Sequence, residues 1–408
     1  MAYRGRAIAY ASALWAAAVA PLVAQAAPGA APKGVEEPRA RGFQRILWMH
    51  GGPAPSAELF AAVRQLGFDA VQVSGGAPTQ LPGQYGLRYY HDQLCGKGVL
   101  ELRAAQYEPL VAAYSRDRNA AVLQRPNCLS SLDTLTGLIE TARVRLDTTL
   151  PTHPLAISLG DEISITRHAN PLDLCVAPDS LRGFRKFLEA RYGTVERLNQ
   201  AWGTDFDVFA RVLPFSADAI RQRELGGARL PRNLAPWAAH REFMDGELAR
   251  VVWCLTEQVK RRAGGLPCGL TGLQQPSAYG GHDFARLLPN LTLFEAYDHG
   301  AARDLAMCLA PPEALQLATL FAPKSGEPPQ LVLARLADMV AHGIWGVVVW
   351  SSGEVFRADR RPSTFGGAVA KAFRELARPA AAFAGARLRR GPVWIVESQP
   401  SVRAWWML

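Results

Sequence analysis

Asp161 and Glu162 are the two residues whose type and position best suit chemistry. They directly follow residues 155–160, an apolar run with the composition of a buried strand. Neighbouring carboxyl groups repel each other, which tends to raise the pKa of one and suits it to donate a proton. The structural alternative is that Asp161 caps the next segment while Glu162 pairs with an arginine. Position alone leaves both interpretations open.

Eight short segments rich in β-forming residues alternate with longer helical patterns. The expected strands are residues 45–51, 70–74, 88–91, 155–160, 268–273, 291–296, 315–321 and 346–350. Alternating strands and helices predict a parallel sheet, and eight such units predict a closed (β/α)8 TIM barrel of the α/β class. Barrel enzymes carry their catalytic groups where strands end and loops begin. Asp161 and Glu162 would therefore lie at the mouth of the fourth strand.

The segments flanking the barrel suggest export and a second domain. Residues 1–26 have the layout of a secretory signal peptide, which predicts a secreted or periplasmic protein without membrane contact after cleavage. An uncleaved membrane anchor is the alternative. Residues 27–42 are expected to be a linker and residues 43–385 the barrel, with a helical insertion after strand four. Residues 386–408 are expected to open a truncated α/β domain, with a strand at 392–396.

Composition narrows the classes of partner. The net charge is +9, but no basic block is interleaved with aromatic residues, so a nucleic-acid surface is not expected. The six cysteines are Cys95, Cys128, Cys175, Cys254, Cys268 and Cys308. Export would allow disulfides, but the wide spacing matches no zinc or redox motif and leaves all fifteen pairings open. In a large domain such residues more often fill the core.

One segment is similar to a known family. Residues 184–204 (FRKFLEARYGTVERLNQAWGT) closely resemble a stretch of the glycoside hydrolase family 42 β-galactosidases. Residues 294–298 and 333–350 resemble the family's strand-six mouth and its seventh helix with eighth strand, and residues 391–408 resemble the start of its Rossmann-like trimerisation domain. In that family the stretch follows the acid/base glutamate of strand four. The resemblance therefore implies that Glu162 is the proton donor and that Asp161 supports it.

Two departures from the family matter. Family members often hold zinc with a cysteine cluster after strand four, but here Cys175 stands alone there with Ser180 nearby, so neither a metal nor a cofactor is predicted. The family's clan also places a nucleophilic glutamate at the end of strand seven. This sequence reads ATLFAP at 318–323.

A second carboxyl group is needed about 5 to 5.5 Å from the first for retention of configuration, or about 6.5 to 9.5 Å away for inversion. The candidates are Glu295 after strand six, Glu327 after strand seven and Glu354 after strand eight. Glu295 is preferred, because it ends a strand and has Tyr297 and Asp298 beside it. The alternative is that Glu295 only binds a sugar hydroxyl.

Sugar sites combine aromatic platforms with hydrogen-bonding groups. The residues expected to bind substrate, all at or near strand ends, are His50, His91, Asp92, Arg125, Asn127, Asp161, Gln274, Tyr297 and Trp350. Trp48, Tyr279, His282 and Asp283 fall in similar places. For each residue taken singly, a packing role or a satisfied surface group is the simpler interpretation.

The sequence thus predicts an exported β-galactosidase-like glycoside hydrolase whose partner is a carbohydrate, with Glu162 and Glu295 as catalytic residues. The alternative is a carbohydrate-binding barrel that has lost the strand-seven nucleophile and with it turnover. A metal-dependent barrel hydrolase or lyase is less favoured, since the histidines are dispersed. Homo-oligomerisation stays open.

Overall fold

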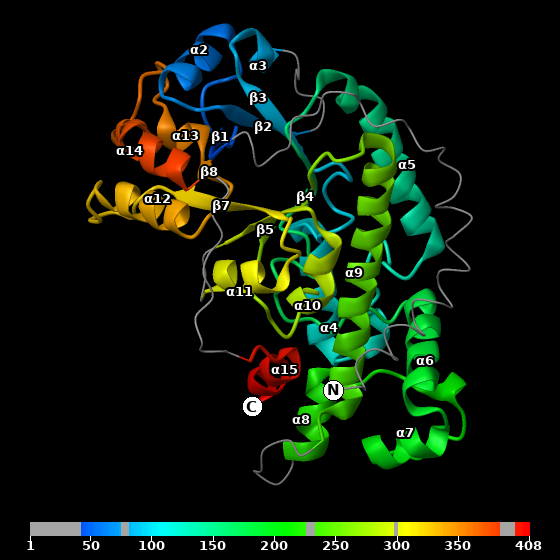
Figure 1. Cartoon of the computed structure of the whole chain (residues 1–408). Helices are drawn as coiled ribbons and strands as arrows, with labels where there is room; N and C mark the ends of the chain where they lie inside the picture. The colour runs from blue at the N-terminus through cyan, green and yellow to red at the C-terminus, as the bar shows by residue number, and fades with distance from the viewer. Residues whose placement is uncertain (1–41, 75–80, 226–232, 298–300, 384–395) are drawn as a thin grey trace.

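Eight parallel strands form a closed barrel in the order β1 to β8 (Figure 1). The computed structural model describes residues 42–74, 81–225, 233–297, 301–383 and 396–408. The strands are β1 (Gln44–Leu47), β2 (Ala70–Ser74), β3 (Arg88–Asp92), β4 (Ile157–Asp161), β5 (Cys268–Leu273), β6 (Leu293–Ala296), β7 (Leu315–Phe321) and β8 (Gly346–Trp350). The predicted (β/α)8 barrel is confirmed. The expected signal peptide lies outside the described residues, as does the linker up to Arg41.

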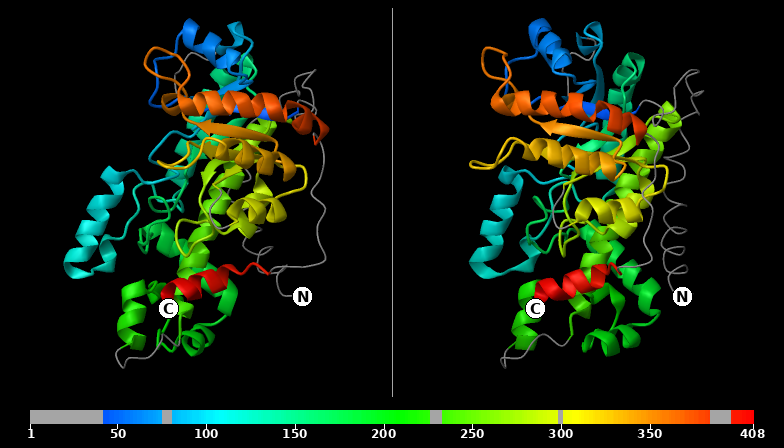
Figure 2. Two further views of the ribbon diagram at one scale, coloured as in Figure 1. Left: turned by 90° about the vertical axis from the view of Figure 1, so that its left-hand side faces the viewer. Right: turned by 60° about the vertical axis from the view of Figure 1, so that its left-hand side comes forward.

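Helices surround the barrel and extend it on one side (Figures 1 and 2). They are α2 (Ala57–Gln65), α3 (Leu81–Gln84), α4 (Ala104–Asp117), α5 (Leu132–Thr149), α6 (Pro178–Tyr192), α7 (Val195–Trp202), α8 (Ala217–Leu225), α9 (Ala235–Ala263), α10 (Phe284–Leu287), α11 (Ala302–Leu309), α12 (Leu331–Ala341), α13 (Ser352–Val355), α14 (Thr364–Ala382) and α15 (Gln399–Met407). Within the described part of the chain, none of them combines the length and apolarity needed to cross a bilayer.

Strand alternation decides which side chains enter the barrel. On β3, Tyr90 packs inside with Trp48 at a ring-centroid distance of 6.3 Å. Tyr89 lies on the opposite face, where its hydroxyl donates to the carbonyl of Thr149 in α5. Because successive residues of a strand point to opposite sides, Asp92 lies inside with Tyr90, and His91 lies outside with Tyr89.

The predicted helical insertion after β4 is present as α6 to α9. Its family-like segment forms α6 and α7, joined at Gly193 (φ 76°) and Thr194, whose side chain accepts a hydrogen bond from the Arg197 amide. Phe184 and Trp202 are fully buried, with ring centroids 6.3 Å apart. The most recognisable stretch of the sequence therefore stabilises a helical hairpin.

The last helix, α15, packs on α9 and on the loop after β5. The Trp406 ring stacks on Trp237 with centroids 5.7 Å apart, and Gln399 donates to the carbonyl of Ser277 at 2.7 Å. Arg403 forms a buried ion pair with Asp245. Most of the strand expected at 392–396 lies outside the described residues, and its last residue, Val396, is exposed and not in a strand.

Breaking the buried ion pair of α15 should destabilise the protein. In the variant Arg403→Met, Asp245 keeps its carboxyl group in the interior without its closest cation. Removing one partner of a buried pair costs about 3 to 5 kcal/mol. We expect urea denaturation to show a decrease in the free energy of unfolding at the lower end of this range, because the Asp245 carboxyl can take up a proton. The exposed neighbour provides the control Trp405→Ala, and equal stability of both variants would contradict this role of α15.

Candidate active site

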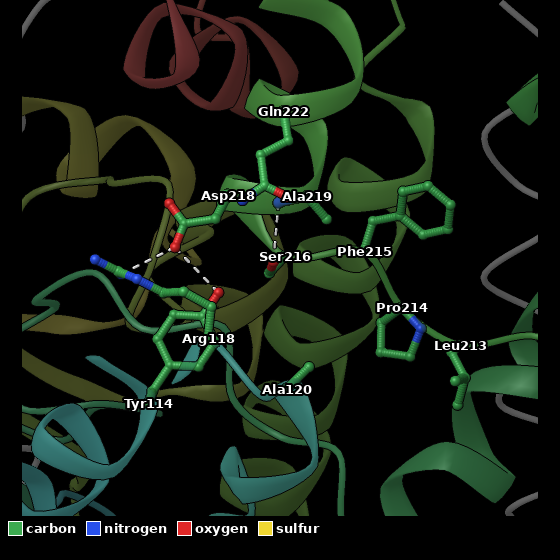
Figure 3. Close-up of a pocket in the computed structure, with 10 residues that line it drawn as sticks. All are labelled: Tyr114, Arg118, Ala120, Leu213, Pro214, Phe215, Ser216, Asp218, Ala219 and Gln222. Carbon is green, nitrogen blue, oxygen red and sulfur yellow. Dashed lines mark hydrogen bonds and ion pairs between the residues drawn. The ribbon is translucent and has the colours of Figure 1, made fainter. Parts of the chain in front are cut away.

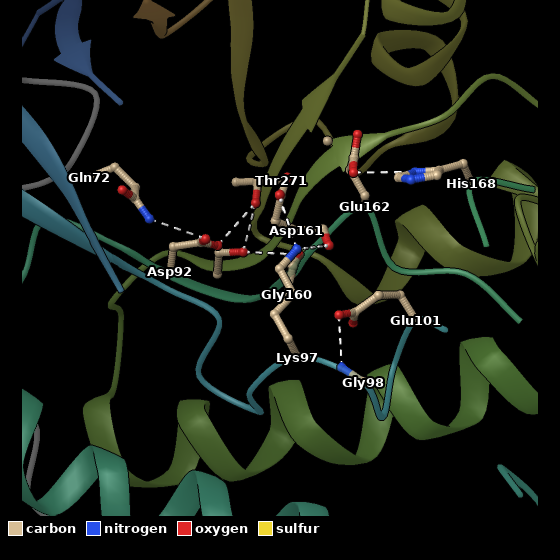
Figure 4. A network of polar contacts seen from close by, with 12 residues as sticks. Gln72, Asp92, Lys97, Gly98, Glu101, Gly160, Asp161, Glu162, His168 and Thr271 are labelled. Carbon is tan, nitrogen blue, oxygen red and sulfur yellow. Dashed lines mark hydrogen bonds and ion pairs between the residues drawn. The ribbon is translucent and has the colours of Figure 1, made fainter. Parts of the chain in front are cut away.

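Glu162 stands at the mouth of β4, directly after Asp161, the last residue of the strand. Its Oε1 accepts a hydrogen bond from the Tyr297 hydroxyl at 3.0 Å, and its Oε2 lies 3.3 Å from Nδ1 of His168 (Figure 4). The side chain is 27% exposed. Solvent or a substrate can therefore reach a carboxyl group whose orientation is fixed on both sides.

The backbone at Glu162 is left-handed, with φ of 54°. This region is uncommon for residues with a side chain, and its cost of order 1 kcal/mol must be offset by surrounding contacts. The Glu162 amide donates to the carbonyl of Thr271 in β5 at 3.1 Å. Figure 4 shows the result, with Glu162 directed toward His168 and Asp161 directed toward Lys97. The two adjacent acids thus have different surroundings.

Asp161 is held by a lysine. Lys97 Nζ lies 3.2 Å from Asp161 Oδ2 and 3.1 Å from the carbonyl oxygen of the same residue. Burial raises the pKa of Asp161, Lys97 opposes this effect, and the charge of Glu162 adds to it. The repulsion between neighbouring acids predicted from the sequence is therefore present, but it raises the pKa of Asp161.

Asp92 lies deeper in the barrel and is completely buried. It accepts hydrogen bonds from Gln72 Nε2 at 3.3 Å and from Thr271 Oγ1 at 3.2 Å. Burial, reinforced by the charge of Asp161, raises the pKa of Asp92 to about 7. Asp92 therefore belongs to the same acidic group as Asp161, below the mouth of the barrel.

Glu295 on β6 is 2% exposed and joins this group from the other side. Its Oε1 accepts a hydrogen bond from Thr319 on β7, and Gly272 donates a backbone hydrogen bond to the carboxyl group. Oε2 has no partner among the described residues. Burial raises the pKa of Glu295 to about 8, and Asp161 and Asp92 add to the shift. Burial therefore favours the protonated form of Glu295 in the free protein.

Gly272 on β5 allows the carboxyl groups to come together. Its φ is 61°, and a Cβ atom there would lie 2.5 Å from Asp161 Oδ1 and 2.9 Å from Glu162 Cγ. Both approaches are closer than real Cβ contacts, so a larger residue would displace one of the acids. The sequence alone gives no sign of this role, because it depends on the pairing of β5 with β4.

Aromatic rings line the mouth on the side of β1 and β8. The Trp350 ring lies 5.4 Å from that of Trp48 and stacks on His50 at 5.2 Å. In the closed strand order, β8 and β1 stand opposite β4 and β5. The mouth thus combines an aromatic wall with an acidic wall, an arrangement suited to the faces and hydroxyl groups of a sugar.

The mouth of β7 carries Phe321, whose side chain is 39% exposed. Its ring centroid lies 5.7 Å from that of Tyr297, the tyrosine that hydrogen-bonds Glu162. An apolar ring therefore occupies the end of the strand on which the resemblance leads one to expect a glutamate.

Three residues expected to bind substrate are not brought to these carboxyl groups. The His91 ring lies between β3 and α5, with Nδ1 3.5 Å from Thr149 Oγ1, and burial lowers its pKa to about 4. Arg125 donates to backbone carbonyls, including those of Val99 and Ile165, so it ties loops together. Asn127 is exposed and donates to the carbonyl of Gly98. The structure thus turns His91 outward and engages the Arg125 guanidinium with carbonyls, and substrate binding by these three residues stays a prediction.

The four predicted residues that follow β5 have different surroundings. Gln274 is next to the acids, with Nε2 3.4 Å from the carbonyl of Gly272. Tyr279 and His282 have structural partners: Tyr279 donates to Asp173, and His282 Nε2 lies 2.9 Å from the carbonyl of Ile163. Asp283 pairs with Arg286. Lys97, His168, Thr271 and Gly272 were missed by sequence reasoning, since they meet the acids only through the course of the loops and the strand pairing.

A pocket of about 240 Å³ lies elsewhere, between α4 and α8 (Figure 3). Tyr114, Arg118, Leu213 and Phe215 contribute to its lining. Its polar groups are engaged with one another, since Tyr114 and Arg118 both contact Asp218 Oδ2. It contains none of the carboxyl groups of the barrel mouth.

The raised pKa of Glu295 has a consequence for stability. The unfolded value is near 4.5 and the folded value about 8, so the stabilisation is complete below the unfolded pKa and is lost as pH rises through the folded one. Each unit corresponds to about 1.4 kcal/mol. We expect the parent to lose about 4 kcal/mol more than Glu295→Gln between about pH 5 and about pH 9. Urea unfolding at both pH values measures this, and parallel losses would contradict it.

The sequence around Glu162 matches a known protein family. The model of glycoside hydrolase family 42, described as β-galactosidase, matches residues 160–211. This region runs from the end of β4 into the helical insertion and includes both acids of the pair. A β-galactosidase from Thermus thermophilus is 59% identical over 32 residues, which are 8% of this chain and 5% of that protein. The resemblance to family 42 β-galactosidases is thus confirmed over this region.

Solved structures extend the likeness to the whole barrel. The β-galactosidase from Marinomonas ef1 has a TM-score of 0.57 at 13% identity, covering 84% of this chain and 60% of that one. The β-galactosidase from Rahnella sp. R3 has a TM-score of 0.58 at 15% identity, with coverage of 85% and 57%. The catalytic domain of a β-amylase from Paenibacillus polymyxa has a TM-score of 0.55 at 11% identity, with coverage of 81% and 97%. At such identities the likeness shows the fold alone.

Proposed function

We propose that this protein is a glycoside hydrolase of the β-galactosidase type and that Glu162 protonates the oxygen of the scissile glycosidic bond. The observation that carries the proposal is the position of Glu162. Its carboxyl group stands at the mouth of β4 within the region that matches family 42, and it is held by Tyr297 and His168 while still partly exposed. A general acid needs this combination of fixed orientation and access to the leaving group.

Glu295 is proposed as the second carboxyl group. It lies on β6, and Tyr297 lies two residues beyond it. Because burial raises its pKa to about 8, it must lose a proton before it can attack or stabilise the anomeric carbon. Thr319 and the Gly272 amide are placed to stabilise the ionised form by donating hydrogen bonds.

The remaining groups of the mouth are proposed to bind the sugar. Trp350 and His50 offer ring faces for the apolar side of a pyranose, while Asp161, Asp92 and Gln274 offer polar groups for its hydroxyls. The proposed substrate class is a β-galactoside, following the description of the family model.

The rival function is carbohydrate binding without turnover. This rival rests on Phe321, which stands at the mouth of β7 where the resemblance leads one to expect a glutamate. Both functions need the same aromatic and acidic walls, so only a measurement of turnover separates them.

A screen of the purified full-length chain against a library of aryl glycosides tests the proposal. We expect release of the aryl group from β-galactosides above the rates for α-galactosides, with loss of the activity in Glu162→Gln. Isothermal titration of the same sugars should be run in parallel. Binding of galactosides without release of the aryl group would favour the rival function, and neither binding nor release would contradict both.

Export is proposed from residues 1–26, whose layout is that of a signal peptide. N-terminal sequencing of protein recovered from a secreting host should read Ala27 as the first residue. Recovery of the chain with Met1 in the membrane fraction would instead indicate an uncleaved anchor.

A further inference from the structure

Two of the six cysteines meet in the structure. Cys175, in the loop between β4 and α6, is fully buried, and its Sγ lies 3.8 Å from Sγ of Cys128, in the loop between α4 and α5. Cys175 therefore has a second cysteine beside it, whereas the sequence suggested that it stands alone. The two residues are 47 positions apart, which is why their spacing carried no signal.

Backbone amides surround both sulfur atoms. The amides of Arg125 and Ala177 donate to Cys175 Sγ at 3.3 and 3.4 Å. Those of Ser130 and Ser131 donate to Cys128. Hydrogen bonds from amides favour a thiolate over a thiol. The four amides therefore favour a thiolate within the pair.

The two thiols differ in character. The hydrogen bond from Cys175, helped by the amides of Ser130 and Ser131, lowers the pKa of Cys128 to about 6. The same hydrogen bond, followed by burial, raises the pKa of Cys175. Of the charged groups that face the pair, Arg125 and Arg250 are cationic and Asp179 is anionic. Cys128 is also partly exposed, whereas Cys175 is buried.

We propose that Cys128 and Cys175 form a redox-active thiol pair, in which Cys128 is the attacking thiol and Cys175 the resolving thiol, and that its oxidised form is an intramolecular disulfide. An accessible, activated thiol poised next to a second cysteine is the arrangement of redox-sensitive sites. The oxidant is a small-molecule or protein disulfide, as found where exported proteins fold.

The chemistry proceeds by thiol–disulfide exchange. The Cys128 thiolate attacks one sulfur of the oxidant, whose S–S bond breaks, and its other half leaves as a thiolate that takes up a proton. The Cys175 thiol gives its proton to solvent and attacks Cys128 Sγ, which releases the second half as a thiol. Two protein thiols are oxidised to one disulfide, and one disulfide is reduced to two thiols.

The bridge would connect two loops at the barrel mouth. The loop of Cys175 also carries His168, the neighbour of Glu162. Arg125, in the loop of Cys128, already joins the two loops through the carbonyl of Ile165. A disulfide that links Cys128 to Cys175, 47 positions apart, should raise the midpoint temperature of unfolding by about 5 °C. The redox state of the cysteine pair would therefore set the rigidity of these two loops.

Mass spectrometry of the full-length protein tests the proposal independently of any glycosidase activity. The reduced protein is incubated with oxidised glutathione, denatured and alkylated. We expect a mass lower by two hydrogen atoms, two fewer alkylated thiols and a cross-linked peptide containing Cys128 and Cys175. The matched control Cys308→Ser, which removes an exposed cysteine on α11, should form the same bridge. Cys128→Ser should form none, and Cys175→Ser should retain a glutathione adduct on Cys128.

Three results would overturn the proposal. Both thiols could remain fully alkylated after oxidation, or the cross-link could join other cysteines. The third result is one zinc ion per chain in the purified protein that is lost in Cys128→Ser, because the pair would then be part of a metal site. In the described part of the chain no third histidine, cysteine or carboxylate joins the two sulfur atoms, whereas structural zinc takes four ligands.

Discussion

Replacing Glu162 by glutamine should slow hydrolysis of galactosides with poor leaving groups by about 10²- to 10⁴-fold, the usual contribution of a general acid. An amide keeps the size of the side chain and its hydrogen bond from Tyr297, but it has no acidic proton to transfer to the leaving oxygen. Aryl galactosides with good leaving groups need little protonation of the leaving oxygen, so their loss should be much smaller. Steady-state kinetics on a series of aryl galactosides measures both effects.

Glu101→Gln is the matched control. Glu101 also lies near the mouth of the barrel and is buried, and its Oε1 accepts a hydrogen bond from the Gly98 amide at 2.8 Å. It has no proposed contact with the sugar. We expect wild-type dependence on the leaving group in this variant. A Glu162→Gln protein with parental rates on poor leaving groups would refute the assignment of Glu162 as the acid.

The second large effect is expected for Glu295→Gln. If Glu295 attacks or stabilises the anomeric carbon, its loss should reduce turnover on the order of 10³-fold or more, whatever the leaving group. The pattern differs from that of Glu162→Gln, because protonation of the leaving group cannot replace a missing carboxylate. In the parent, kcat/KM should also gain a rising limb near the pKa of about 8 that burial gives Glu295.

The variant Thr319→Val separates a catalytic role of Glu295 from a structural one. It removes the hydroxyl that donates to Glu295 but keeps the carboxyl group and the shape of the side chain. We expect the rising limb to shift to higher pH in Thr319→Val, since the ionised form loses a donor. Parental rates in Glu295→Gln would show that the second carboxyl group is another residue. Glu327, in the loop after β7, and Glu354, in α13 after β8, would then be tested in the same way.

The fold was readily predictable from the sequence. Eight apolar runs separated by helical patterns have few other solutions than a closed barrel, and the eight predicted strands correspond to β1 to β8. The predicted and observed limits of these eight strands differ only at the strand ends. The first strand, for example, was expected to continue to Gly51 but ends at Leu47. Such ends depend on pairing with neighbouring strands, which a single sequence does not show.

The site was predictable only where it depends on strand ends. Glu162, Tyr297 and Trp350 lie at the mouth because each closely follows or ends a strand. His91 was misplaced because its strand carries an aromatic and a polar residue on both faces, so the sequence does not show which face turns inward. Lys97 and His168 reach the acids from loops, and Cys128 meets Cys175 across two loops. Contacts of this kind are set by tertiary packing.

A crystal structure of the Glu162→Gln protein soaked with an unhydrolysed β-galactoside would test the central claim most directly. We predict that the glycosidic oxygen lies about 2.6 to 3.2 Å from the side-chain amide at position 162. The sugar ring should lie between Trp350 and the acidic wall, with the Glu295 carboxyl group below the anomeric carbon. A galactoside bound elsewhere, or with its glycosidic oxygen turned away from position 162, would contradict the assignment of Glu162 as the proton donor.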